Sequence, residues 1–181
     1  MPSWWGIAIH EIGHAVVYTV LGVGLVTTAR IGGRGGATDV AASVEGLQHE
    51  AGLTRLIACL LAGRAAEALI LDRISIGSGG GPDSDLAKAT NLAIEMEHAF
   101  GLGSEMPLLY HPPTDNSMAL RNDRSLATRV NARLEAAYDD ARRIIDQHRE
   151  VVVSLATRLQ AARVIDGADI RAAIAREGGA E

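Results

Sequence analysis

Apolar residues recur at helical spacing along most of the chain, and glycine-rich stretches separate these segments. The first segment, residues 4–21, is apolar over much of its predicted surface, which indicates a largely buried helix. β-Branched residues favour a strand over 23–31, and the glycines at 32–36 favour a turn. Residues 38–44 favour a second strand that returns along the first.

The remaining apolar segments predict helices over 48–71, 83–100, 123–148 and 150–162, and a last short helix that Asp166 caps and that ends near residue 175. We expect Asp83 to be the N-cap of the helix over 83–100. A glycine-rich loop precedes it, and the prolines within 101–121 predict a loop there. No repeat or shift in composition divides the chain. We therefore expect one mainly α-helical domain, residues 1–181, with a small β-sheet next to the first helix.

Composition and charge exclude some classes of partner. The formal net charge is −5, which argues against nucleic acid as the main partner because phosphate binding needs a clustered positive surface. Cys59 is the only cysteine, so no internal disulfide forms. The most apolar stretch, residues 15–26, is shorter than the roughly 20 residues that a membrane helix needs, and no basic segment precedes it. We expect a soluble, cytoplasmic chain without membrane contact.

The first predicted helix carries the motif His10-Glu11-Ile12-Gly13-His14. Positions i and i+4 lie on one helix face, so both imidazoles can ligate one zinc ion. Glu11 then lies beside the open coordination position, where it can take a proton from water. Gly13 costs about 1 kcal/mol of helix propensity relative to alanine, which indicates a close approach there. The alternative is a pair of solvated histidines, but apolar residues flank the motif on both sides.

A catalytic zinc of this kind needs a third protein ligand. The other histidines, His49, His98, His111 and His148, lie near helix ends or in the proline-containing loop and are expected to be solvated. Asp85 follows a run of glycines and lies in the first turn of a predicted helix, where the helix dipole favours a charged carboxylate. The residues alone explain Asp85 equally well as an ordinary acid at a helix N-terminus, so the third ligand stays open.

Several segments resemble the peptidase domain of the FtsH family, the membrane-anchored AAA+ zinc proteases. Residues 8–15 resemble its HEAGHA signature, with Ile12 in place of an alanine. Residues 61–67 resemble its AGRAAE segment, and residues 85–90 resemble its DLxxAT segment. Residues 159–170 are similar to its closing helical signature. The resemblance covers nearly the whole chain.

The resemblance implies a zinc-dependent endopeptidase that hydrolyses peptide bonds in unfolded polypeptides. Residue by residue, it implies that His10, His14 and Asp85 hold one Zn²⁺ and that Glu11 is the general base. The same comparison implies one mainly helical peptidase domain, in agreement with the apolar pattern.

Two further features follow from the resemblance. Glu67, the glutamate of the AGRAAE-like segment, is expected to contact a ligand histidine, and the alternative is an ion pair with Arg64. The strand near Ile31 resembles the family's substrate-binding edge strand, where a peptide adds as a further strand. The family's Pro-Arg-Gly is replaced there by residues 33–35, Gly-Arg-Gly.

The resemblance also implies a homohexameric ring and an AAA+ ATPase domain acting in cis or in trans. Residues 77–81 lack the Gly-Lys-Ser/Thr ending of a P-loop, so ATP would act only through an ATPase domain outside this chain, and we expect an excised domain. The alternatives are a stand-alone, ATP-independent zinc peptidase and a zinc-binding assembly domain without turnover. The intact Glu11 argues against the second. A metal-free helical interaction module is a third, weaker alternative.

Overall fold

The elements follow one another along the chain much as the apolar pattern predicts. The helices and strands are α1 (Trp4–Leu21), β1 (Gly24–Gly32), β2 (Gly35–Ala42), α2 (Glu50–Leu71), α3 (Asp85–His98), α4 (Asn116–Asn122), α5 (Arg124–Gln147), α6 (Arg149–Ala162), β3 (Val164–Asp166) and α7 (Gly167–Gly178). Short 3₁₀ helices lie before α2, at Glu45–Leu47, and after it, at Ile76–Ser78. The computed structural model describes residues 4–33, 35–42, 45–111 and 116–178. The expectation of a mainly α-helical chain with a small sheet beside the first helix is confirmed.

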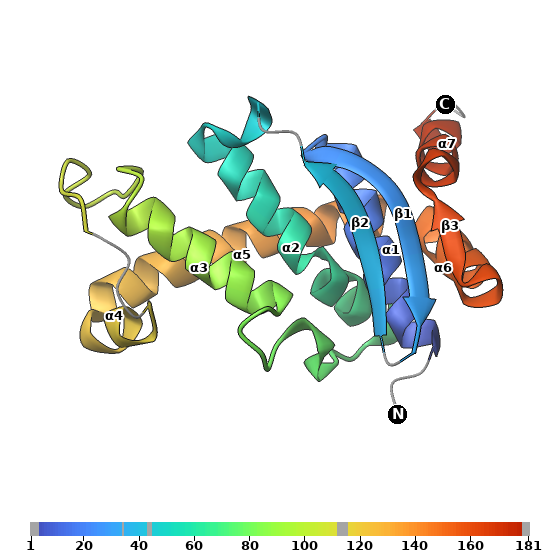
Figure 1. The fold of residues 1–181 in the computed structure, drawn as a ribbon, viewed down its shortest axis with the longest axis horizontal. Helices are drawn as coiled ribbons and strands as arrows, with labels where there is room; N and C mark the ends of the chain where they lie inside the picture. Colours follow the sequence, from blue (N-terminus) through green and yellow to red (C-terminus); the bar gives the residue numbers. More distant parts are fainter. Residues whose placement is uncertain (1–3, 34, 43–44, 112–115, 179–181) are drawn as a thin grey trace.

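Helix α1, which carries the motif from His10 to His14, lies at the centre of this arrangement. α1 packs against α2, α6 and β1, and Figure 1 shows β1 and β2 crossing in front of it. The long helix α5 runs behind α2 and supports it from the far side. Within the described part of the chain, no helix is both long and apolar enough to cross a membrane.

The sheet is antiparallel with strand order β2-β1-β3, so β1 is the central strand and β2 is an edge strand. β3 pairs with β1 at Thr28, Ala29 and Arg30, and the Ile31 amide donates to the Arg163 carbonyl at 2.9 Å. The expectation that the strand near Ile31 is an edge strand is therefore wrong. β3 was not predicted because three residues carry too little of an alternating pattern.

Helix boundaries differ from the expectations in two places. Residues 116–122 form α4, so the predicted loop over 101–121 is wrong there, because Ala119 and Leu120 pack against the core. Asp166 does cap α7, since its Oδ1 accepts from the Ala168 amide at 2.7 Å, but the helix continues to Gly178. Residue 34, the end of the predicted second strand at 43–44, and residues 112–115 of the predicted loop lie outside the described residues.

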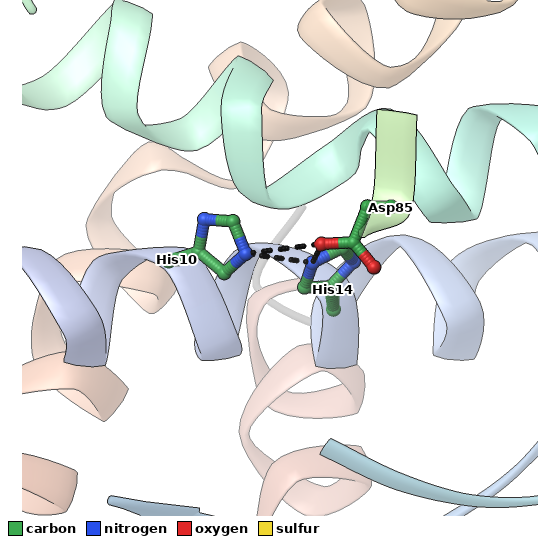
Figure 2. A group of neighbouring side chains, drawn as sticks. All are labelled: His10, His14 and Asp85. Carbon is green, nitrogen blue, oxygen red and sulfur yellow. Dashed lines mark hydrogen bonds and ion pairs between the residues drawn. The ribbon is translucent and has the colours of Figure 1, made fainter. Parts of the chain in front are cut away.

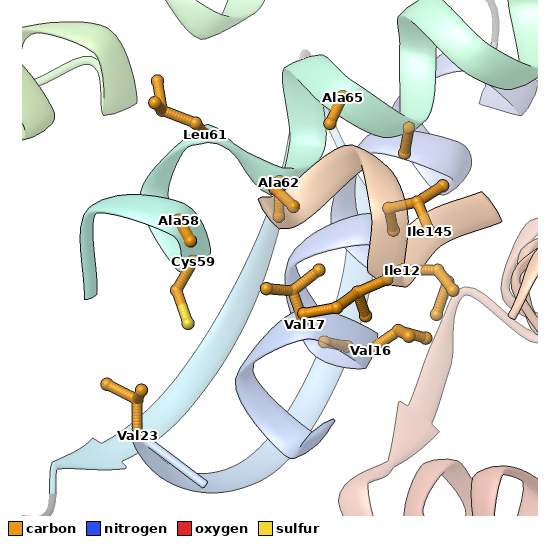
Figure 3. Close-up of a cluster of buried hydrophobic side chains, with 14 of the residues drawn as sticks. Ile12, Val16, Val17, Val23, Ala58, Cys59, Leu61, Ala62, Ala65 and Ile145 are labelled. Atoms are coloured by element: carbon orange, nitrogen blue, oxygen red, sulfur yellow. The ribbon is translucent and has the colours of Figure 1, made fainter. Parts of the chain in front are cut away.

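The core is made of closely packed small and branched side chains. Figure 3 shows Ile12, Val16 and Val17 of α1 near Ala62 of α2 and Ile145 of α5. All five side chains are fully buried. This packing fixes the position of α1, and therefore of the motif that it carries.

Gly13 marks the closest approach of α1 to α2. A Cβ at this position would lie 2.6 Å from the Ala66 Cβ and 2.9 Å from the Ala62 carbonyl oxygen, closer than real Cβ atoms come. The close approach that the sequence indicated at Gly13 is thus the approach of a second helix. It brings α2 against the face of α1 that carries the two histidines.

A buried ion cluster fixes α3 on α5. Glu97 of α3 is 7% exposed, and it accepts from Arg133 Nε at 2.6 Å and from Arg129 Nε at 2.8 Å. Burial alone would raise the pKa of the Glu97 carboxyl, but the two guanidinium groups outweigh it and lower the pKa. The carboxylate is therefore charged and holds the helix whose first residue is Asp85.

Candidate metal centre

Three side chains from two helices converge at one point. His10 and His14 come from α1 and Asp85 comes from the start of α3, and their ligand atoms all lie within 4.8 Å of one another. The two Nε2 atoms are 3.1 Å apart, and Asp85 Oδ2 lies 3.3 Å from each (Figure 2). Ligands of a tetrahedral zinc with bonds of about 2.0–2.1 Å are about 3.3 Å apart. The triangle therefore has the size of one face of a zinc site.

A hydrogen-bond partner at Nδ1 of each imidazole orients its Nε2 atom toward the cluster. His14 Nδ1 lies 2.8 Å from the Cys59 carbonyl oxygen, and His10 Nδ1 lies 2.8 Å from Glu67 Oε1. Both oxygens accept, so each Nδ1 donates, and a neutral ring then presents its Nε2 lone pair to the shared point. Two lone pairs and a carboxylate oxygen repel one another unless a cation or an added proton lies between them. Such a set of donors fits a divalent metal.

The charges at the cluster also favour a cation. Burial alone would lower the pKa of His10, but hydrogen bonds to Asp85 and Glu67 raise it to about 9. Burial would raise the pKa of Asp85, yet its hydrogen bonds with His10 and His14 bring it well below its usual range. The Asp85 and Glu67 carboxylates thus favour a positive charge beside His10. A metal ion and a proton would compete for the same position.

α2 leaves room for these rings at Gly63. A Cβ at Gly63 would lie 2.6 Å from both His10 Nε2 and His14 Nε2, so any side chain there would fill the space between the histidines and α2. The contact of Gly63 with the two histidines was not predicted from the sequence. A glycine inside a helix costs about 1 kcal/mol relative to alanine, and that cost was the available signal.

Glu67 meets His10 rather than Arg64. Glu67 is 3% exposed, and its carboxylate also accepts hydrogen bonds from the amide and hydroxyl of Ser75, the latter at 2.9 Å. These bonds and the contact with His10 outweigh the effect of burial and lower the pKa of Glu67. The described residues show no ion pair between Glu67 and Arg64. Ser75, which the sequence did not indicate, belongs to this support of the His10 ring.

The start of α3 differs from the expectation in its cap. Ser84 is the N-cap, and its Oγ accepts from the Ala87 amide at 3.3 Å, so the assignment of Asp83 to this role is wrong. Serine and aspartate are equally good caps, and sequence cannot choose between neighbours when either fits. Asp85 is then the first residue of α3, and Asp83 lines the cleft without joining the cluster.

A cleft of about 950 Å³ opens over the cluster. Its walls come from α1, the start of β2, the end of α2 with the segment that follows it, and the start of α3. Glu11 lines it beside His10 and His14, although the whole residue is only 7% exposed. The carboxylate of Glu11 lies against β2, where Thr38 Oγ1 is 2.9 Å from Oε2.

The remaining histidines lie elsewhere. His98 and His111 face each other with ring centroids 5.2 Å apart, and His148 pairs with Glu177. His49 precedes α2 and makes no side-chain capping bond. Across the ranges that the structure describes, no second group of three side chains could hold a metal ion.

Comparison with known proteins identifies the family. The model for peptidase family M41 matches residues 5–173. Three relatives are each named an ATP-dependent zinc metalloprotease FtsH (FtsH 2 in Symbiobacterium thermophilum). The Acidothermus cellulolyticus protein is 32% identical, and the match covers 94% of this chain and 28% of the relative. The Paraburkholderia phymatum protein is 31% identical over 96% of this chain and 29% of the relative, and the Symbiobacterium protein is 30% identical over 91% of this chain and 29% of the relative. The chain thus spans less than a third of each relative. It belongs to peptidase family M41 and corresponds to an FtsH-family peptidase domain.

Proposed function

We propose that this chain is a zinc-dependent endopeptidase whose single Zn²⁺ is held by His10, His14 and Asp85. The observation that carries the proposal is the convergence of two Nε2 atoms and one carboxylate oxygen at spacings of 3.1–3.3 Å. Family M41 and the names of the relatives support a zinc metalloprotease. The space over Gly63 and the fixed Nδ1 donors support the same ligand set.

We assign the residues of the cleft different roles in peptide hydrolysis. A zinc ion held by His10, His14 and Asp85 would polarise the scissile carbonyl and lower the pKa of the attacking water. Glu11 takes a proton from that water and later delivers it to the leaving amine. Glu67 holds His10 in one orientation by accepting from its Nδ1 at 2.8 Å, as an outer partner of a metal-binding histidine does.

The substrate proposed is an unfolded polypeptide. β2 is an edge strand, and its first four residues, 35–38, line the cleft beside Glu11. An extended peptide can add to the free edge of such a strand by main-chain hydrogen bonds, which require little side-chain specificity. We therefore propose that a substrate strand adds to β2 rather than to β1.

The ATPase partner, the oligomeric state and the cellular compartment of this chain are also proposals. The relatives are named ATP-dependent, and this chain matches less than a third of each. We propose that an AAA+ ATPase domain acts with it in cis or in trans, in a homohexamer in the cytoplasm, with no nucleic acid partner. A stand-alone peptidase and a zinc-binding assembly domain are the alternatives.

Hydrolysis of casein by the purified chain tests the proposed function. We expect cleavage of casein and short peptides with zinc, loss of cleavage with a zinc chelator, and its return when zinc is restored. ATP should change none of these rates, and tightly folded proteins should stay intact. Bound zinc without any cleavage would favour the assembly domain, and cleavage that resists the chelator would contradict a metal mechanism.

A further inference from the structure

Thr38 of the edge strand β2 contacts the proposed base directly. Its Oγ1 lies 2.9 Å from Glu11 Oε2 and also 2.9 Å from the Glu11 carbonyl oxygen. Among the residues that the structure describes, Thr38 makes the only side-chain hydrogen bonds to Glu11. A hydroxyl has one proton, so Thr38 donates to one of these two oxygens at a time or shares the proton between them.

β2 also closes the other side of the Glu11 side chain. A Cβ at Gly36 would lie 2.5 Å from Glu11 Cγ and 2.7 Å from Oε1, so the strand backbone passes directly against the carboxylate. Only glycine leaves this space for the side chain. The Glu11 carboxylate is therefore held between the Thr38 hydroxyl on Oε2 and the Gly36 backbone beside Oε1.

We propose that Thr38 is a positioning residue for Glu11, a proposal that rests on the proposed function. A glutamate has three rotatable side-chain bonds, and a general base acts only when it lies within hydrogen-bond reach of the proton it takes. The Thr38 hydroxyl donates a hydrogen bond to Oε2 and thereby fixes the rotation of the carboxylate. Because the Thr38 hydroxyl bonds to Oε2, the role of accepting the proton of the attacking water falls to Oε1.

A purely structural role for the same hydroxyl is the alternative, because the bond to the Glu11 carbonyl joins β2 to α1. Two variants separate the roles. Thr38→Val keeps the shape of the side chain and removes the hydroxyl, and valine is also favoured in strands. Thr38→Ser keeps the hydroxyl and removes only a methyl group.

Thr28→Val is the matched control. Thr28 lies on β1, and its Oγ1 donates to Asp39 Oδ2 at 2.7 Å. This variant removes a bond of the same kind from the same sheet, outside the residues that line the cleft.

The test measures kcat and KM for an unfolded peptide substrate, together with zinc content and thermal unfolding. We expect Thr38→Val to lower kcat by about 10–100-fold, with KM and zinc content unchanged, because small displacements of a catalytic group have effects of this size. Thr38→Ser should keep most of the activity, and Thr28→Val should keep all of it. A crystal structure of zinc-loaded Thr38→Val should show the Glu11 carboxylate displaced while His10 and His14 stay in place.

Several results would overturn the proposal. Wild-type kcat in Thr38→Val would do so, as would equal losses in the valine and serine variants or a loss that follows zinc content. If Thr38→Val does not fold, Thr38→Ala repeats the comparison with Thr38→Ser. If the wild-type chain shows no zinc-dependent cleavage, the proposed function itself is wrong. If the wild type is active and Thr38→Val is equally active, only the role of Thr38 is wrong.

Discussion

Asp85→Ala is expected to weaken zinc binding by at least tenfold and to abolish peptide hydrolysis. The change removes one of the three proposed ligands and leaves two imidazoles, whose Nε2 atoms are 3.1 Å apart, without the carboxylate that would balance the metal charge. The loss of a ligand acts on affinity directly, whereas loss of an outer contact typically costs 10–100-fold. Competition between the chain and a coloured chelator measures the affinity.

Asp83→Ala is the matched control for this variant. Asp83 lies two residues earlier and lines the same cleft, but it is absent from the cluster. Because Ser84 caps α3, the control should lose at most about 0.3–1 kcal/mol of stability from a weaker interaction with the helix dipole. If Asp83→Ala lost the metal and Asp85→Ala kept it, the ligand assignment would be wrong.

Glu11→Gln is expected to lower kcat by about 10²–10⁴-fold or more while zinc stays bound. The amide has nearly the shape of the carboxylate, and its oxygen can still accept from Thr38, so the tight space against Gly36 remains filled. The amide cannot take a proton at neutral pH. Steady-state rates and zinc content are measured on the same preparation.

Glu97→Gln controls for the loss of a buried charge. Glu97 and Glu11 are both 7% exposed, but Glu97 pairs with Arg129 and Arg133, and none of these three residues lines the cleft. This control should lower the unfolding temperature and leave kcat unchanged. Loss of zinc in Glu11→Gln, or full activity in it, would show that Glu11 is not the base.

The sequence predicted the parts of the site that depend on local spacing. His10, Glu11 and His14 lie on one buried helix because helical periodicity fixes their relative positions within five residues. Asp85 was left open by its residues, since a helix N-terminus explains it equally well, and only the resemblance selected it. The structure brings it to 3.3 Å from both histidines.

The supporting contacts could not be predicted, because they depend on how distant elements cross. Gly63 is close to the imidazoles only because α2 crosses α1 at Gly13. Thr38 meets Glu11 because β2 runs along α1, and Ser75 meets Glu67 because the chain turns back after α2. Short elements were missed for a related reason: α4 and β3 have too few residues to show a period.

X-ray absorption at the zinc edge, measured on the purified chain after reconstitution with zinc, reports the atoms that bind the metal. We expect about one zinc per chain with nitrogen and oxygen ligands at about 2.0–2.1 Å. We expect no sulfur ligand, because Cys59 contacts His14 through its carbonyl oxygen. Zinc content near zero, or a sulfur ligand at about 2.3 Å, would contradict a metal site made of His10, His14 and Asp85.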